Sequence, residues 1–215
     1  MEKETLKNIF KFIEEKGEHR TPFLWKWKNN IPLTEEDLNV NGNLDLRHSN
    51  ITSLPEGLKV WGNLILEYSK IASLPEGLKV KGSLILSATK ITSLPKGLEV
   101  GGSIFLNESL IKALPEGLKV KGSLDLSNTK ITSLPNGLQV KGQLSLFGTK
   151  IKSLPEGLEV GGCIYLSFST IKTLPKGLKV GGTLQIGQTR LTRYSDEELM
   201  KMIEPGFITN SIIRL

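Results

Sequence analysis

The chain has 215 residues, of which 38% are hydrophobic and 23% charged, and its formal net charge is +6 at pH 7. Its single cysteine excludes an internal disulfide framework and a cysteine-rich metal site. Uninterrupted apolar stretches are all shorter than the roughly 18 residues of a membrane-spanning helix, so we expect no membrane partner. Charged residues at the start of the chain, in place of the apolar run of a secretory signal, predict a cytoplasmic protein.

Residues 1–30 are predicted to form a helical and aromatic N-terminal cap. Apolar residues recur there with the i, i+3, i+4, i+7 spacing of an amphipathic helix: Leu6, Ile9, Phe10 and Ile13. We expect Gly17 to end this helix. An aromatic segment at residues 23–27 then follows, and we expect it to cover the first unit of the repeat described next.

Residues 31–193 repeat with a period of 20, because Leu-Pro-x-Gly-Leu returns seven times between Leu54 and Leu174. Six positions of each unit are apolar, as residues 61–80 show: Leu64, Leu66, Ile71, Leu74, Leu78 and Val80. The alternation at Leu64 and Leu66 indicates a short strand, and Pro75 with Gly77 indicates a tight turn. Twenty residues leave no room for a helix in each unit.

The fold predicted from this period is a mainly β solenoid whose 20-residue units, called coils below, each add one strand to a single parallel sheet. It begins with a half coil at residues 31–40, continues with seven full coils, and ends with a partial coil. The repeat fails at Tyr194, where Leu-Pro is due. Residues 194–215 are predicted to be a C-terminal cap with a short helix, because Ser195 and Glu198 form a capping-box pattern.

The pattern Leu-x-Leu-x-x-Thr-x-Ile-x-x-Leu-Pro at residues 84–95 resembles the leucine-rich repeat in its short bacterial and phage form. The resemblance covers about residues 38–193 and implies a right-handed coil without convex helices. For a protein-binding function, argued below from the strand face, the resemblance implies one specific version, a phage or bacterial inhibitor directed at a bacterial defence protein. Where the family usually has an asparagine that bonds the backbone of the bend, this chain has serine or threonine, and we expect the hydroxyl groups to replace it only in part.

Nothing in the sequence supports catalysis, and we expect neither a cofactor nor a metal. The two histidines, His19 and His48, have no recurring nucleophile or carboxylate beside them. Cys163 occupies a strand position where other coils have a small polar residue, so a structural role is favoured over a reactive one. The chain is therefore interpreted as a binding protein and not as an enzyme.

One residue of each strand is predicted to point outward between two buried residues. The residues at this position vary from coil to coil, while the six apolar positions stay apolar. This row runs Asp45, Ile65, Ile85, Phe105, Asp125, Ser145, Tyr165 and Gln185. Apolar members and their neighbours form the predicted partner-binding residues: Ile65, Tyr68, Ile85, Phe105, Phe147, Tyr165 and Phe168. An exposed apolar stripe is typical of a binding surface, although the same residues also pair well across strands and would then serve only the sheet.

A second row, just after the strand, is rich in lysine: Lys70, Lys90, Lys130 and Lys150. We expect these lysines to steer an acidic protein surface toward the stripe. A nucleic-acid-binding protein is the alternative, because rows of lysine neutralise phosphates. A structural or self-assembling protein is a second alternative. The expected solution state is a monomer or a weak oligomer.

Overall fold

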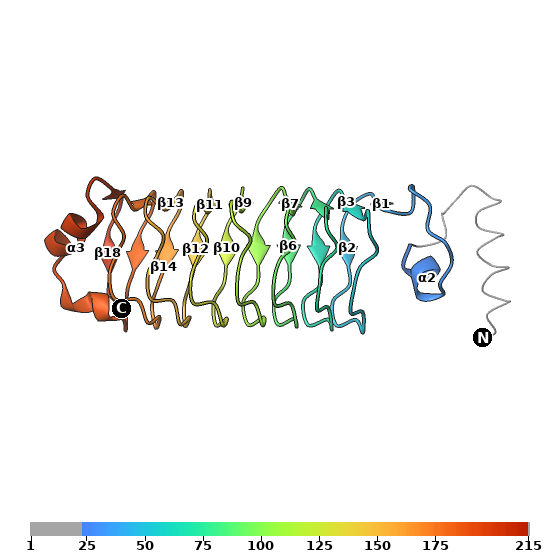
Figure 1. Cartoon of the computed structure of the whole chain (residues 1–215), viewed down its shortest axis with the longest axis horizontal. Helices are drawn as coiled ribbons and strands as arrows, with labels where there is room; N and C mark the ends of the chain where they lie inside the picture. Colours follow the sequence, from blue (N-terminus) through green and yellow to red (C-terminus); the bar gives the residue numbers. More distant parts are fainter. Residues whose placement is uncertain (1–22, 215) are drawn as a thin grey trace.

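The computed structural model describes residues 23–214 and shows a parallel β-solenoid, as the period predicted. The coils stack along the long axis of the molecule, with helix α2 (Phe23–Lys28) near the N-terminal end and helix α3 (Asp196–Ile203) at the other (Figure 1). The helix predicted from Leu6 to Gly17 lies outside the described residues. The aromatic segment forms α2, from which Trp27 packs against the core.

A nine-stranded sheet, called the front sheet, runs the length of the solenoid. All its strands are two residues long and parallel, and neighbours within the repeat pair in a register of 20 residues. The strands are β2 (Leu44–Asp45), β4 (Leu64–Ile65), β6 (Leu84–Ile85), β8 (Ile104–Phe105), β10 (Leu124–Asp125), β12 (Leu144–Ser145), β14 (Ile164–Tyr165), β16 (Leu184–Gln185) and β18 (Ile212–Ile213).

Each coil also has a second strand, so the prediction of one strand per coil and one sheet was wrong. The extended segment before each corner pairs with its neighbours because adjacent coils already lie at strand spacing. A four-stranded back sheet contains β1 (Asn39–Val40), β3 (Lys59–Val60), β5 (Lys79–Val80) and β7 (Glu99–Val100). A five-stranded back sheet contains β9 (Lys119–Val120), β11 (Gln139–Val140), β13 (Glu159–Val160), β15 (Lys179–Val180) and β17 (Phe207–Ile208).

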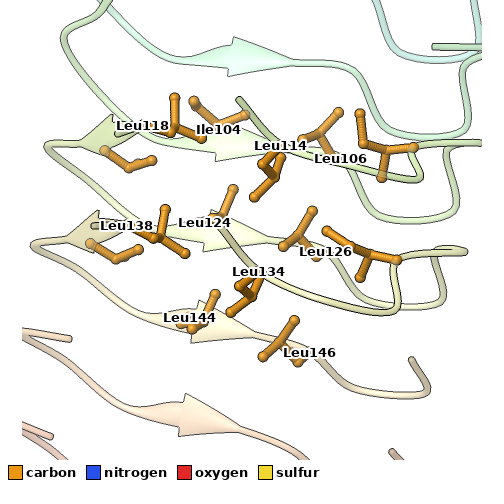
Figure 2. Close-up of a cluster of buried hydrophobic side chains, with 14 of the residues drawn as sticks. Ile104, Leu106, Leu114, Leu118, Leu124, Leu126, Leu134, Leu138, Leu144 and Leu146 are labelled. Atoms are coloured by element: carbon orange, nitrogen blue, oxygen red, sulfur yellow. The ribbon is translucent and has the colours of Figure 1, made fainter. Parts of the chain in front are cut away.

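The six apolar positions of each coil fill the space between the front and back sheets. In one coil they are Leu124, Leu126, Ile131, Leu134, Leu138 and Val140, each at most 8% exposed. Equivalent leucines of successive coils lie one above the other in columns (Figure 2). Each such side chain contributes about 1.5–3 kcal/mol by leaving water. Within the full coils, only Ile51 and Leu98 depart from the predicted burial, and both are half-buried.

A polar column links most successive coils at the residue before the front strand. Asn63 donates its backbone N–H to Asn43 Oδ1 at 2.8 Å, and Ser83 donates its N–H to Asn63 Oδ1 at 2.7 Å. Serine hydroxyls continue the pattern, as Ser123 N–H donates to Ser103 Oγ at 2.9 Å. This ladder was not predicted, although the recurring Asn or Ser one residue before the strand was its signal.

The hydroxyl groups predicted to support the bend do so where the residue is threonine, and Ser69 accepts the Ile71 N–H at 3.5 Å. Thr89 and Thr129 donate to the carbonyl oxygens of Leu86 and Leu126, in each case at 2.6 Å. Three serines in the same column have a buried Oγ without a hydrogen-bond partner among the described residues: Ser49, Ser109 and Ser169. The expectation is therefore confirmed for the threonines and wrong for these serines, whose hydroxyls are less restricted in rotamer.

Ser109→Thr is expected to stabilise the protein by about 1 kcal/mol, because it adds a buried methyl group and the missing hydrogen bond. Thr89 and Thr129 occupy the same position in the coils on either side and are buried, so the column accepts the larger side chain. Urea unfolding followed by circular dichroism measures the change. The reverse substitution, Thr129→Ser, is the matched control and is expected to lower stability by a similar amount; a destabilised Ser109→Thr variant would contradict this account.

The C-terminal cap contains the predicted helix and one feature that the sequence analysis missed. The capping box of α3 is confirmed, since Ser195 and Glu198 bond each other's backbone N–H groups. After the helix the chain forms β17 and β18, which extend the five-stranded back sheet and the front sheet. Lys179 pairs with Phe207, a separation of 207 − 179 = 28 residues, which is one 20-residue coil plus the eight residues of α3. The cap is therefore a further coil with a helix inserted into it.

Candidate functional site

The outward positions of the front sheet form a continuous row, as predicted. Ile65 pairs with Ile85, and Ile85 pairs with Phe105, so these three side chains lie on adjacent strands. Asp125 comes next, and Tyr165 follows two strands later. All five side chains are half-buried because their neighbours in the row cover their flanks. Asp45 pairs with Ile65 at the other end, so the row presents a short apolar stripe with a carboxylate at each end.

A sharp bend follows each front strand, and its backbone adopts positive φ in every coil from residue 48 to residue 188. The residues at this bend are His48, Tyr68, Ala88, Glu108, Asn128, Gly148, Phe168 and Gln188. Glycine and asparagine adopt this conformation easily, whereas a bulky aromatic residue is strained there by about 1–2 kcal/mol. Tyr68 at φ 54° and Phe168 at φ 60° are therefore residues that the bend itself disfavours.

Both of these strained aromatic side chains are exposed and in contact with a second ring. Phe168 is 58% exposed, and its ring centroid lies 5.1 Å from that of Phe147, which is 38% exposed. Tyr68 is 54% exposed and stacks on His48 with a centroid distance of 5.0 Å and an interplanar angle of 4°. His48 was not predicted as a surface residue, although it precedes Tyr68 by one 20-residue period, which places the two at equivalent positions of adjacent coils.

Tyr165, predicted to join Phe147 and Phe168, lies on the outward row. Burial raises the pKa of its phenol above the ordinary value, and the adjacent Cys163 thiol adds to the effect. Cys163 itself belongs to the polar column that links the coils, since its Sγ accepts the N–H of Thr183 at 3.3 Å. This contact gives the cysteine a structural role, as the sequence suggested.

The lysine row lies beyond the bend, and the four side chains named above are all exposed. Within residues 23–214 none of them forms an ion pair. The row is interrupted by Leu110, which is exposed, and by Thr170, whose hydroxyl donates to the Ile151 carbonyl. On the back sheets, in contrast, lysines pair with glutamates of adjacent coils, as Lys79 does with Glu99 at 2.8 Å. The lysines beside the front sheet therefore lack the ion pairs that some lysines of the back sheets form.

Comparison with known proteins finds no family whose model matches the chain, and no curated protein sequence matches it. The part of the structure described here contains no group of three or more histidine, cysteine or acidic side chains arranged to hold a metal ion. Among the same residues, no helix combines the length and the apolar character needed to cross a membrane.

Proposed function

We propose that this chain is a protein-binding module that contacts its partner through the outer face of the front sheet. The observation that carries the proposal is the pair of exposed aromatic residues, Tyr68 and Phe168, at bends that disfavour them. Strain and solvent exposure both act against these residues in the free protein. A residue retained against both costs is better accounted for by contact with a partner than by stability of the fold.

The rigid coils favour binding with little loss of conformational entropy. The coils are fixed by two backbone ladders and a packed core, so the bound surface exists before the partner arrives and little entropy is lost on association. Exposed rings such as Phe147 and Phe168 are suitable anchors, because large aromatic side chains dominate the energy of protein interfaces. The unpaired lysines beyond the bend would accelerate association with an acidic surface.

A narrower form of the proposal follows the resemblance to short leucine-rich repeats of bacteria and phages. In this form the partner is a bacterial protein, and the chain acts as its inhibitor by covering a functional surface. The proposal involves neither catalysis nor a cofactor. The narrower form rests on the resemblance and not on the residues of the site, and a fold alone does not determine function.

The test is capture of a partner from nuclease-treated bacterial lysate by the wild-type chain and by an Ile65→Ser, Ile85→Ser, Phe105→Ser triple variant. We expect the wild type to retain a protein that the triple variant loses, because the variant removes the apolar stripe from the centre of the face. Circular dichroism first establishes that the variant folds.

The matched control replaces two exposed aromatic residues elsewhere on the solenoid, Trp61→Ser and Phe207→Ser, which are 54% and 47% exposed. Phe207 belongs to a back sheet, and Trp61 lies at the corner after one. This control is expected to retain the partner. Equal losses in the control and in the triple variant would show that general surface hydrophobicity, and not the front face, captured the protein.

A nucleic-acid-binding function is the second candidate, supported by the four unpaired lysines. It predicts that replacing Lys70, Lys90, Lys130 and Lys150 with alanine abolishes binding to double-stranded DNA or RNA, with a steep dependence on salt. Leu110 and Thr170 interrupt the row, so we expect binding no stronger than that of a nonspecific basic surface. Tight binding of DNA or RNA by the apolar triple variant would favour nucleic acid over protein as the partner.

A further inference from the structure

The back of the solenoid has one discontinuity, which divides its strands into the four-stranded and five-stranded sheets. β7 and β9 belong to adjacent coils, yet they are not paired within the described structure. The row of back strands is visibly interrupted between their labels in Figure 1. On the front sheet the same two coils remain joined, because β8 pairs with both β6 and β10. The two coils are therefore joined through the front sheet and through the Gly122 N–H, which donates to the Gly102 carbonyl at 3.1 Å, and the opening is confined to β7 and β9.

The opening leaves backbone groups that the repeat would otherwise pair. In the next coil, Lys141 donates its N–H to the Val120 carbonyl at 3.0 Å. The equivalent bond from Lys121 to Val100 is not formed, nor is any backbone bond from the Lys119 N–H, within the part of the chain that the structure describes. Two donors on the edge of β9 and the carbonyl edge of β7 therefore face the gap.

A cleft of about 430 Å³ occupies this position. Val80, Leu98 and Leu118 are among the residues that line it, and Leu98 is half-buried where the equivalent leucines of other full coils are buried. The cleft therefore has an apolar floor between two strand edges. These are the two elements by which sheets accept an extended peptide: main-chain hydrogen bonds and a pocket for alternate side chains.

The rim of the cleft is positively charged. Its lysines are Lys79, Lys81, Lys119 and Lys121, and its carboxylates are Glu99 and Glu116, a balance of 4 − 2 = +2. Lys79 bonds Glu99 and lowers the pKa of that carboxyl below its ordinary value, and Lys81 and Lys121 add to the effect. Lys119 and Lys121 form no ion pair with other residues in the 23–214 range.

We infer that this cleft is a second binding site, which accepts an extended acidic segment of a partner protein as an added strand between β7 and β9. Carbonyl groups of the segment accept the Lys119 and Lys121 N–H groups, and its own N–H groups donate to the edge of β7. An apolar side chain of the segment contacts Leu98, and acidic side chains on either side of it face the lysines. The site lies on the back of the solenoid, so this inference does not depend on the proposed function of the front face.

Two measurements on the full chain test the inference. Amide hydrogen exchange is expected to show that the Lys119 and Lys121 amides exchange freely, whereas those of Gln139 and Lys141, which donate to Leu118 and Val120, are protected. The probe is a fluorescein-labelled hexapeptide of alternating glutamate and valine. Its binding is expected to protect the Lys119 and Lys121 amides and leave the exchange of the other two unchanged.

Variants then assign the binding to this cleft. Lys119→Glu with Lys121→Glu is expected to weaken peptide binding about tenfold or more, because it reverses the charge of one wall. The matched control, Gln139→Glu with Lys141→Glu, places glutamates at the same two positions one coil away, where the back sheet is closed, and changes the charge by −3 instead of −4. This control and the front-face triple variant are both expected to bind the peptide as the wild type does.

Three results would overturn the inference. Equal protection of the Lys119 and Lys141 amides in the free protein would show that the back sheet is closed in solution. Protection by inorganic phosphate alone would show a site for small anions instead of an added strand. Absence of peptide binding, or binding that both glutamate variants weaken equally, would show that the cleft does not recognise an extended acidic segment.

Discussion

Replacing Gly142 with alanine is expected to destabilise the solenoid by about 3 kcal/mol, near the upper end of the usual cost of overpacking. A Cβ atom at this position would lie 2.8 Å from the carbonyl carbon of Gly122 and 2.6 Å from the hydroxyl oxygen of Ser123, both in the preceding coil. Backbone cannot rotate away as a side chain does, so the two coils would have to separate. The same Ser123 hydroxyl accepts the Gln143 N–H, and separation would break this bond as well.

The matched control is Gly137→Ala, which tests conformational strain without a clash. Gly137 has φ +70°, but a Cβ atom there would meet nothing within 4 Å. Its expected cost is about 1 kcal/mol, from positive φ alone. Thermal unfolding followed by circular dichroism should therefore place the Gly142→Ala midpoint well below that of Gly137→Ala. Equal midpoints would mean that the coils are less closely packed than the structure shows.

The coil itself was predictable because its signals are local and repeated. Apolar residues at six positions, with proline and glycine at the turn, recur without a change of spacing, so one coil determines the others. The capping box of α3 was predictable for the same reason, since Ser195 and Glu198 are only three residues apart. Short-range chemistry of this kind leaves a pattern that reads directly from the sequence.

The missed features all depend on what neighbouring coils do to one another. A two-residue strand such as Lys59–Val60 has too little alternation to be recognised alone, and it becomes a strand only by pairing with the next coil. The last coil was missed because the insertion of α3 shifts Phe207 and Ile212 out of the 20-residue period. The break between β7 and β9 is a missing contact between coils, so the repeat pattern carries no sign of it.

The sequence predicted which residues form the candidate face, but it did not predict the backbone conformation of the bends beside them. Ile65, Ile85 and Phe105 were placed side by side from the period alone, and the pairing of their strands confirms it. The positive φ at Tyr68 and Phe168 is set by a bend whose conformation the sequence does not reveal. This geometry is what distinguishes these two residues from ordinary surface aromatics.

Replacing Phe168 with asparagine is the substitution that separates binding from folding. Asn128 already occupies the equivalent bend with φ 56°, so the backbone accepts asparagine without change. Relief of strain contributes about 1–2 kcal/mol, and loss of the ring contact with Phe147 costs about 0.5–1.5 kcal/mol. These terms nearly cancel, so the free energy of unfolding is expected to stay within about 1 kcal/mol of the wild type.

Binding to the captured partner is expected to respond very differently to Phe168→Asn. An exposed aromatic anchor at an interface typically accounts for about 2 kcal/mol or more, which corresponds to a loss of roughly 30-fold in affinity. Urea unfolding and a titration of the partner, made on the same preparation, compare the two quantities directly. A variant that unfolds easily yet binds normally would show that Phe168 serves the fold. A variant that folds normally and binds weakly would show that its ring is retained, despite the strain of its bend, for contact with another molecule.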